Sequence, residues 1–306
     1  MKMNRKQIIA SLIAIFLSVQ FLGIATGYRY LELMSIGIVE PALGDPASPM
    51  TSVWLLAYLM VITSLIILII KFKKKLLTAF EGVAIFFASL IVFELLIPIG
   101  IPLPYIGIIS IGFFLALILT LIHIHKRSYL TQNVALVFAV SGAGAVLGAS
   151  LGVIPVLIFM FALGIYDFIS VFYTKHMVYM AKAITEKPMA FTAAFPTQTK
   201  GQEKHVEKIR SKRIESPETE KPGEKKLKQY SKTFQLGGGD LAIPLVFTVS
   251  LLRIGILHAI SASIGALIAL ILLFIFLLKR PGIAIPALPP VSAGATLGFL
   301  ISLLII

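Results

Sequence analysis

Two of the three aspartates in this sequence, Asp167 and Asp240, lie within long apolar segments. An ionisable side chain inside hydrocarbon is costly, so an acidic residue in such a segment marks a functional site by default. The third aspartate, Asp45, lies in the Pro-rich segment 40–49, where turn formation explains its presence. Asp167 and Asp240 are therefore the first candidates for a reactive site.

A pair of neighbouring carboxyls hydrolyses a peptide bond without a metal, a serine or a cysteine. In a low-dielectric setting the pair holds one proton between its members, because two close negative charges repel. The ionised member is a general base for a water molecule, and the protonated member hydrogen-bonds the scissile carbonyl. The sequence has no cysteine and no HExxH or P-loop pattern. We therefore expect aspartic-protease chemistry with no cofactor and no metal.

The composition predicts that these carboxyls lie in a membrane protein. The chain has 306 residues, of which 58% are hydrophobic and only 13% charged, and its mean hydropathy is +0.96. A soluble domain carries about 25% charged residues. The apolar runs reach about 20 residues, enough to cross a hydrocarbon core of ~30 Å. We predict an all-α polytopic fold, in which the net charge of +13 reports topology and not nucleic-acid binding.

Apolar runs and their breaks predict nine transmembrane helices in a single domain, 1–306. Segment 1–185 holds six spans and 236–306 holds three, while 186–235, rich in Lys, Glu and Pro, is expected to be a flexible cytoplasmic loop. The predicted spans are 8–26, 53–70, 76–97, 105–122, two within 131–174, two within 236–278, and 285–306. The two long segments exceed the bilayer thickness, so we place breaks within 148–155 and 253–258.

Positive charge orients the predicted spans. When nine spans alternate, the Lys and Arg clusters share one side, and only Arg29 and Arg253, two of 27, fall on the other. This asymmetry predicts a cytoplasmic N-terminus and an extracellular C-terminus in the cell membrane. Asp167 is then ~10 Å from the cytoplasmic end of the sixth span, and Asp240 is ~6 Å from the same end of the seventh. We expect the two carboxyls at similar depth on neighbouring helices.

Two further segments are predicted at the depth of the aspartates. Gly237, Gly238 and Gly239 precede Asp240, and glycines weaken a helix and allow close backbone approach. Pro286-Ala287-Leu288-Pro289-Pro290 opens the ninth span, where prolines hold the backbone extended with few donors. A substrate helix must unwind before cleavage, because its amides are hydrogen-bonded. Both segments suit that requirement.

Tyr166-Asp167, the GxGD pattern at 237–240 and Pro286-Ala287-Leu288 resemble the presenilin and signal peptide peptidase family. The segments 169–171 and 174–177 are most similar to archaeal presenilin homologues. The resemblance implies a nine-helix fold and hydrolysis of peptide bonds within transmembrane helices of membrane-protein substrates, with Asp167 and Asp240 as the catalytic dyad. It also implies substrate-binding roles for Tyr166, Gly237, Gly238, Gly239, Pro286, Ala287 and Leu288.

This sequence departs from many relatives at Gly238, where they carry a larger apolar residue, and that departure puts the cleavage-site preference in doubt. The predicted orientation resembles presenilins, whereas signal peptide peptidases are inverted. Substrates are then expected to have their amino termini outside.

Other interpretations of the same residues stay open at this stage. The leading alternative is an ion- or proton-coupled transporter or a cation channel that uses both carboxylates as an ion pathway. A non-catalytic membrane scaffold is a weaker third. Glu81 and Glu94 are explained by snorkelling or interhelical hydrogen bonds. Gly142, Gly144 and Gly148 are typical of close helix packing, and the spacing of His123 and His125 does not favour a metal site.

Overall fold

The computed structural model describes residues 5–72, 74–103, 107–126, 128–173, 192–196, 233–279 and 286–305. Within these ranges the chain forms nine α-helices and two small antiparallel sheets. The helices are α1 (Arg5–Ser35), α2 (Pro49–Phe72), α3 (Lys74–Leu96), α4 (Ile111–His125), α5 (Tyr129–Ser150), α6 (Val153–Phe172), α10 (Gly238–Leu251), α11 (Ile256–Lys279) and α12 (Leu288–Ile305). Strand β1 (Gly100–Leu103) pairs with β2 (Gly107–Ser110), and β3 (Thr192–Pro196) pairs with β4 (Thr233–Gly237).

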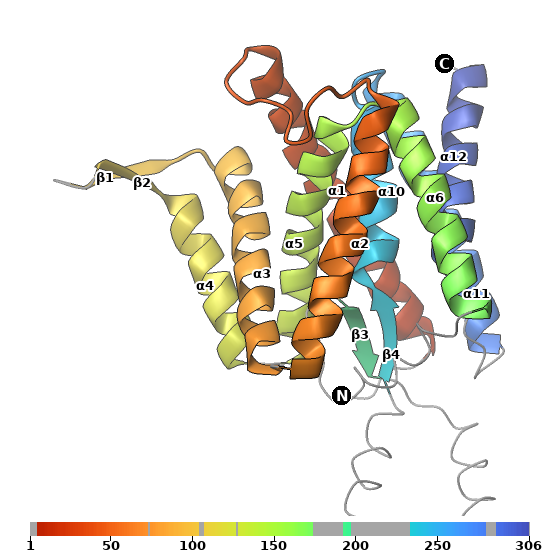
Figure 1. The fold of residues 1–306 in the computed structure, drawn as a ribbon, viewed down its shortest axis with the longest axis horizontal. Coiled ribbons are helices and arrows are strands. Elements are labelled where there is room, and N and C mark those ends of the chain that lie inside the picture. Colours follow the sequence, from red (N-terminus) through yellow and green to blue (C-terminus); the bar gives the residue numbers. More distant parts are fainter. Residues whose placement is uncertain are drawn as a thin grey trace, which may run out of the picture.

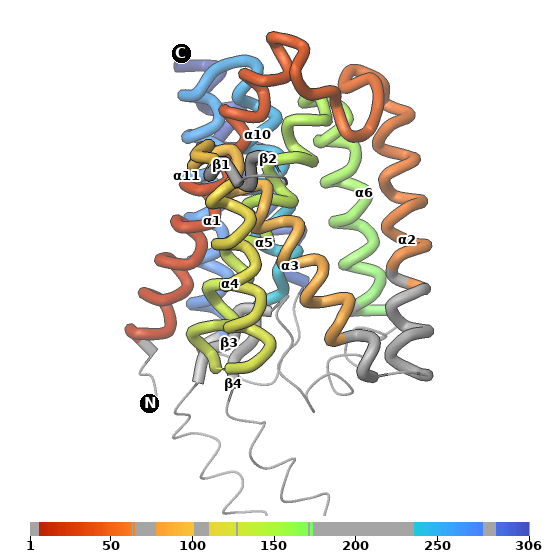
Figure 2. Tube along the Cα trace, turned by 90° about the vertical axis from the view of Figure 1, so that its left-hand side faces the viewer, coloured from red at the N-terminus to blue at the C-terminus, as the bar shows by residue number. Residues whose placement is uncertain are grey.

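Six helices of the described residues are long and apolar enough to cross a membrane: α1, α3, α5, α6, α11 and α12. The apolar segments of α2, α4 and α10 are shorter. The helices run roughly side by side, with the start of α1 and strands β3 and β4 at one end and the end of α12 at the other (Figures 1 and 2). The count of nine membrane spans and the sidedness of the two ends stay predictions.

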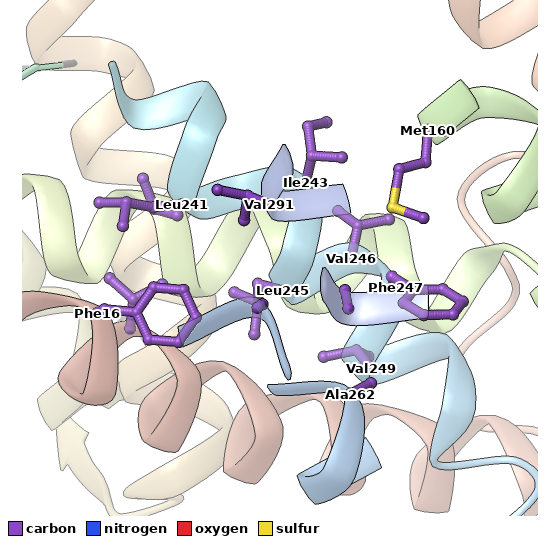
Figure 3. Packing of buried hydrophobic residues seen from close by; sticks show 14 of the residues in the cluster. Phe16, Met160, Leu241, Ile243, Leu245, Val246, Phe247, Val249, Ala262 and Val291 are labelled. Carbon is purple, nitrogen blue, oxygen red and sulfur yellow. The ribbon is translucent and has the colours of Figure 1, made fainter. Parts of the chain in front are cut away.

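Helix α10 lies at the centre of the assembly. It packs against α1, α5, α6, α11 and α12, and its side chains from Ile243 to Leu251 are all buried. Figure 3 shows Leu245, Val246 and Phe247 of α10 in the main hydrophobic core, among side chains of α1, α6, α11 and α12. At 14 residues, α10 is only ~21 Å long, less than the ~30 Å hydrocarbon core. Because protein surrounds it, its non-helical start need not face lipid.

Small residues let α5 approach its neighbours closely, as the sequence predicts. A Cβ on Gly148 would lie 2.6 Å from the carbonyl oxygen of Val246 in α10, and one on Gly144 would lie 2.6 Å from the Leu245 side chain. A Cβ on Gly142 would overlap the carbonyl oxygen of Ala88 in α3. Any larger side chain at these positions would push the helices apart.

The polar residues of α3 contact α4 and its preceding strand. Glu81 and His123 are both buried, and the Glu81 Oε1 to His123 Nε2 distance is 3.5 Å. The Ser110 hydroxyl donates to the Glu94 carboxylate. Interhelical hydrogen bonding, one of the two explanations expected from the sequence, therefore accounts for both glutamates.

Several predicted boundaries are wrong. The first predicted span, 8–26, ends too early, because α1 continues to Ser35 with Arg29 paired to Glu32 on its exposed surface. The fourth, 105–122, begins too early, because 107–110 form β2. The seventh begins at Gly238 and not at 236, because Leu236 and Gly237 end β4. The predicted loop 186–235 contains β3 and most of β4, and its other residues lie outside the described ranges.

Candidate functional site

Asp167 lies on the buried face of α6. Leu163, Asp167 and Ser170 are spaced four and three residues apart, and all three are buried, so they form the stripe that faces the protein. The neighbouring Tyr166 is 37% exposed, since it is one step further around the helix. Asp167 is five residues before the end of α6. The hydrophobic period of α6 therefore directs the carboxyl into the helix assembly.

Asp240 lies in the first turn of α10, at its third residue. Strand β4 runs directly into this helix, with Gly237 in an extended conformation (φ −63°, ψ 139°) as the N-cap residue. The backbone N–H of Gly237 donates to the Asp240 carboxyl. This is half of a capping box, in which an acidic side chain at N3 reaches back to the N-cap amide. An acidic group there also complements the positive end of the helix dipole.

The two carboxyls come together across the α6–α10 contact. These helices pack against each other, and the Asp240 carboxyl lies within Coulombic range of Asp167. Asp167 is 8% exposed, and Asp240 is partly buried beside it. Like charges at short range in a poorly solvated setting favour a shared proton. The arrangement has the elements of a general acid and a general base on either side of one bond.

A third element, the start of α12, touches the pair. The backbone N–H of Leu288 donates to Asp167 Oδ2 at 3.3 Å. Pro286 is buried just before the helix, and Pro289 and Pro290 occupy its first turn, where prolines fit because the amides there have no helical partner. Between the flanking prolines, only Ala287 and Leu288 retain an N–H. The segment predicted to have few donors thus directs one of them at a candidate catalytic carboxyl.

The predicted substrate-binding residues differ in how close they lie to the dyad. A Cβ built on Gly237 would be 3.3 Å from Asp240 Oδ2, whereas one on Gly239 would have no heavy atom within 4 Å. Gly238, between them, is buried at the helix start. Leu288 contacts Asp167, as the hydrogen bond shows. Tyr166 is exposed and does not belong to the buried part of the site.

One residue of the site was missed from the sequence. Pro244 lies inside α10, four residues after Asp240, and has no N–H to donate to the Asp240 carbonyl. The first turn that carries the carboxyl therefore lacks one of its helical hydrogen bonds. A proline within an otherwise apolar helix is the signal that could have identified it.

Among the residues that the structure describes, no group of three or more His, Asp or Glu side chains is arranged to hold a metal ion. Two carboxyls, each with one backbone N–H donor, are the groups that a dyad needs to activate water directly.

The sequence matches the model of a known protein family. A family model described as "Signal-peptide peptidase, presenilin aspartyl protease" matches residues 13–306. No curated protein matches the sequence.

Two solved structures have a similar fold over nearly the whole chain. Both are described as a presenilin family intramembrane aspartate protease, one in a C222 and one in a P2 space group. The first matches with a TM-score of 0.64 and 21% identity, over 97% of this chain and 99% of the other. The second matches with a TM-score of 0.63 and 22% identity, over 97% of each. At this identity the likeness concerns the fold.

Proposed function

This chain belongs to the signal-peptide peptidase and presenilin aspartyl protease family, and from that membership we propose that it is an intramembrane aspartic endopeptidase. Its substrates are transmembrane helices of other membrane proteins, and it acts as a multi-pass protein of the cell membrane. One observation carries the proposal: carboxyls on two different apolar helices that pack together, α6 and α10, lie within Coulombic range of each other.

The proposed reaction uses Asp167 and Asp240 as one acid–base unit. The carboxyl that is ionised removes a proton from a water molecule, whose oxygen attacks the scissile carbonyl carbon. The carboxyl that is protonated hydrogen-bonds the carbonyl oxygen and stabilises the developing negative charge. Breakdown of the tetrahedral intermediate breaks the C–N bond, and a proton from the dyad goes to the leaving amine. The Leu288 N–H holds the Asp167 carboxyl in place, which supports a role for the Pro286–Leu288 segment in orienting the dyad.

The backbone leading into Asp240 supports cleavage of an extended substrate. A helical substrate must unwind, because its peptide groups are otherwise shielded. Strand β4 ends at Gly237, immediately before α10, and it pairs with β3 along one edge. An unwound substrate segment added to the other edge would have its peptide groups hydrogen-bonded next to the dyad. The three glycines keep this approach free of side chains.

Cleavage of a transmembrane reporter peptide by purified protein in bicelles tests the proposal. Wild type should release two products whose masses locate one or more cut sites within the apolar segment. Asp167→Asn and Asp240→Asn should each lower the rate by at least about 100-fold, because each removes one half of the acid–base pair. Both variants are nearly isosteric, so thermal unfolding should show that the fold is retained.

The third aspartate provides a matched control. Asp45 accepts a hydrogen bond from the Ala47 N–H at 2.9 Å in the loop between α1 and α2, far along the chain from the dyad. Asp45→Asn should cleave at close to the wild-type rate. Uncut substrate with wild type, or full activity in either dyad variant, would refute proteolysis by this pair. A proton or cation flux in liposomes that both dyad variants lose, without cleavage, would favour the transporter interpretation.

A further inference from the structure

Ser292 of α12 has a buried hydroxyl that no side chain or backbone group satisfies. The residue is 8% exposed, and its Oγ has no hydrogen-bond partner within the described part of the chain. A hydroxyl of this kind costs free energy unless it bonds to something, and ordered water is the usual partner of such groups. Ser292 therefore marks a place in the helix assembly where a water molecule is expected.

Other hydroxyls on α10 and α12 are hydrogen-bonded within their own helices. Thr296 and Ser302 on α12 donate to carbonyl oxygens four and three residues earlier on their own helix. Thr248 of α10 does the same, donating to the Pro244 carbonyl. A serine within a helix ordinarily satisfies itself in this way. The hydroxyl of Ser292 does not, so it is left to bond a group outside its own helix.

The packing of α10 on α12 indicates what lies opposite Ser292. The two helices run in the same direction, and the rings of Phe247 and Phe299 meet with centroids 5.8 Å apart. Seven residues earlier on each helix stand Asp240 and Ser292. Seven residues are nearly two full turns, so each of these residues shares a face with its phenylalanine and lies ~10 Å below it. Ser292 and Asp240 therefore lie on the faces by which α12 and α10 pack against each other.

A hydrogen bond brings the start of α12 to the dyad. Leu288, one turn before Ser292 on the same face, donates its N–H to Asp167 Oδ2. Leu241 and Val291, the neighbours of Asp240 and Ser292 in the sequence, both belong to the main hydrophobic core (Figure 3). The unsatisfied hydroxyl thus lies one turn of α12 beyond the amide that bonds Asp167.

We propose that the Ser292 hydroxyl binds the water molecule that the two carboxyls activate. The inference rests on the proposed proteolysis, because the water it assigns is the one consumed in that reaction. Ser292 fixes the water oxygen between α12 and α10, while the ionised carboxyl accepts its proton. The hydroxyl takes no part in proton transfer. It orients the nucleophile and lowers the entropic cost of bringing water to the peptide bond.

Steady-state kinetics of Ser292→Ala and Ser292→Thr with the reporter peptide test this assignment. Ser292→Ala removes the hydroxyl with little change in volume, and we expect kcat to fall about tenfold, the value of one hydrogen bond, with KM within about twofold of wild type. Ser292→Thr keeps the hydroxyl, and kcat should return to within about threefold of wild type. Thermal unfolding should show that both variants are folded.

Ser302→Ala is the matched control. Ser302 is also a buried serine of α12, but it bonds to His258 Nδ1 at 2.8 Å and lies ten residues further along the helix. This variant should lower the Tm and leave kcat unchanged. A loss of less than threefold in Ser292→Ala, an equal loss in Ser292→Thr, or a change in KM alone would overturn the assignment while the dyad stands. An inactive wild-type protein would end both proposals.

Discussion

At the scale of single residues, Asp240 serves two purposes at once. Its carboxyl caps the start of α10 by accepting the Gly237 N–H, and it faces the Asp167 carboxyl. A capping bond restricts the side chain to one orientation, which is what a dyad needs for repeated proton transfer. The missing hydrogen bond to Pro244 leaves the backbone of the same turn less constrained. A side chain held in one orientation, on a backbone turn that can shift, suits the proposed role of Asp240 beside a substrate strand.

A first prediction concerns the glycine next to that carboxyl. Gly237→Ala adds a methyl group 3.3 Å from Asp240 Oδ2, so the carboxyl must shift by a few tenths of an ångström. Displacement of a reacting group is costly, and we expect kcat to fall about tenfold with little change in Tm. The Gly237 backbone itself allows alanine, because its φ and ψ are those of ordinary extended chain.

Gly239→Ala provides the comparison. The new methyl group meets no atom within 4 Å, and alanine favours the first turn of a helix over glycine by up to ~1 kcal/mol. This variant should have a Tm equal to or above that of wild type, and its loss of kcat should be clearly smaller than that of Gly237→Ala. An equal or larger loss at position 239 would contradict the geometry described for the glycine segment.

At the scale of helices and strands, hydropathy was sufficient to divide the two longest apolar segments. The predicted break within 148–155 contains the observed end of α5 at Ser150, and the break within 253–258 contains the observed start of α11 at Ile256. Such breaks are required because no single helix of that length fits the bilayer. The same reasoning identified α6, α10 and α12 as the elements of the site. It also predicted that consecutive antiparallel helices bring Asp167 and Asp240 together.

The sequence did not predict the strands or the length of α1. Strands β3 and β4 are five residues each, and Ala193, Ala194 and Phe195 have no alternating pattern to set them apart from a loop. The predicted end of α1 rested on the polar residues after Thr26. A helix tolerates such residues on an exposed surface, and Arg29 pairs with Glu32 there. The Leu288 bond to Asp167 joins residues 121 apart in the sequence, so only the fold reveals it.

A second prediction concerns the contact that positions α10. Gly148→Ala would place a methyl group 2.6 Å from the Val246 carbonyl oxygen and 2.7 Å from the Val249 Cβ. Both atoms belong to the packed core, so α10 must move away from α5 at a cost of about 1–3 kcal/mol. We expect a lower Tm and a lower kcat, since Asp240 moves with its helix. Ala143→Leu, on the exposed face of α5, should change neither.

At the scale of the whole molecule, the Lys and Arg clusters and the fold group the same helix ends on one side of the assembly. The start of α1 and the β3–β4 sheet lie at the same end, and the end of α12 lies at the opposite one (Figure 1). The two basic residues that depart from the charge asymmetry both have partners. Arg29 pairs with Glu32, and the Arg253 guanidinium donates to the Ala149 carbonyl near the end of α5. Their positions are explained by local bonds, so they do not weaken the predicted orientation.

The orientation itself is the last prediction, and the absence of cysteine makes it directly testable. Ala47→Cys lies in the exposed loop between α1 and α2, and Tyr129→Cys lies at the exposed start of α5, at the other end of the helices. A membrane-impermeant maleimide added to intact cells should label the first variant and not the second, which should react only after lysis. The reverse pattern would invert the molecule and with it the side from which substrates enter. Labelling of both in intact cells would contradict an odd number of membrane crossings between the two positions. Because Asp167 and Asp240 lie towards the end that carries Tyr129, the same experiment assigns the dyad to the cytoplasmic half of the bilayer.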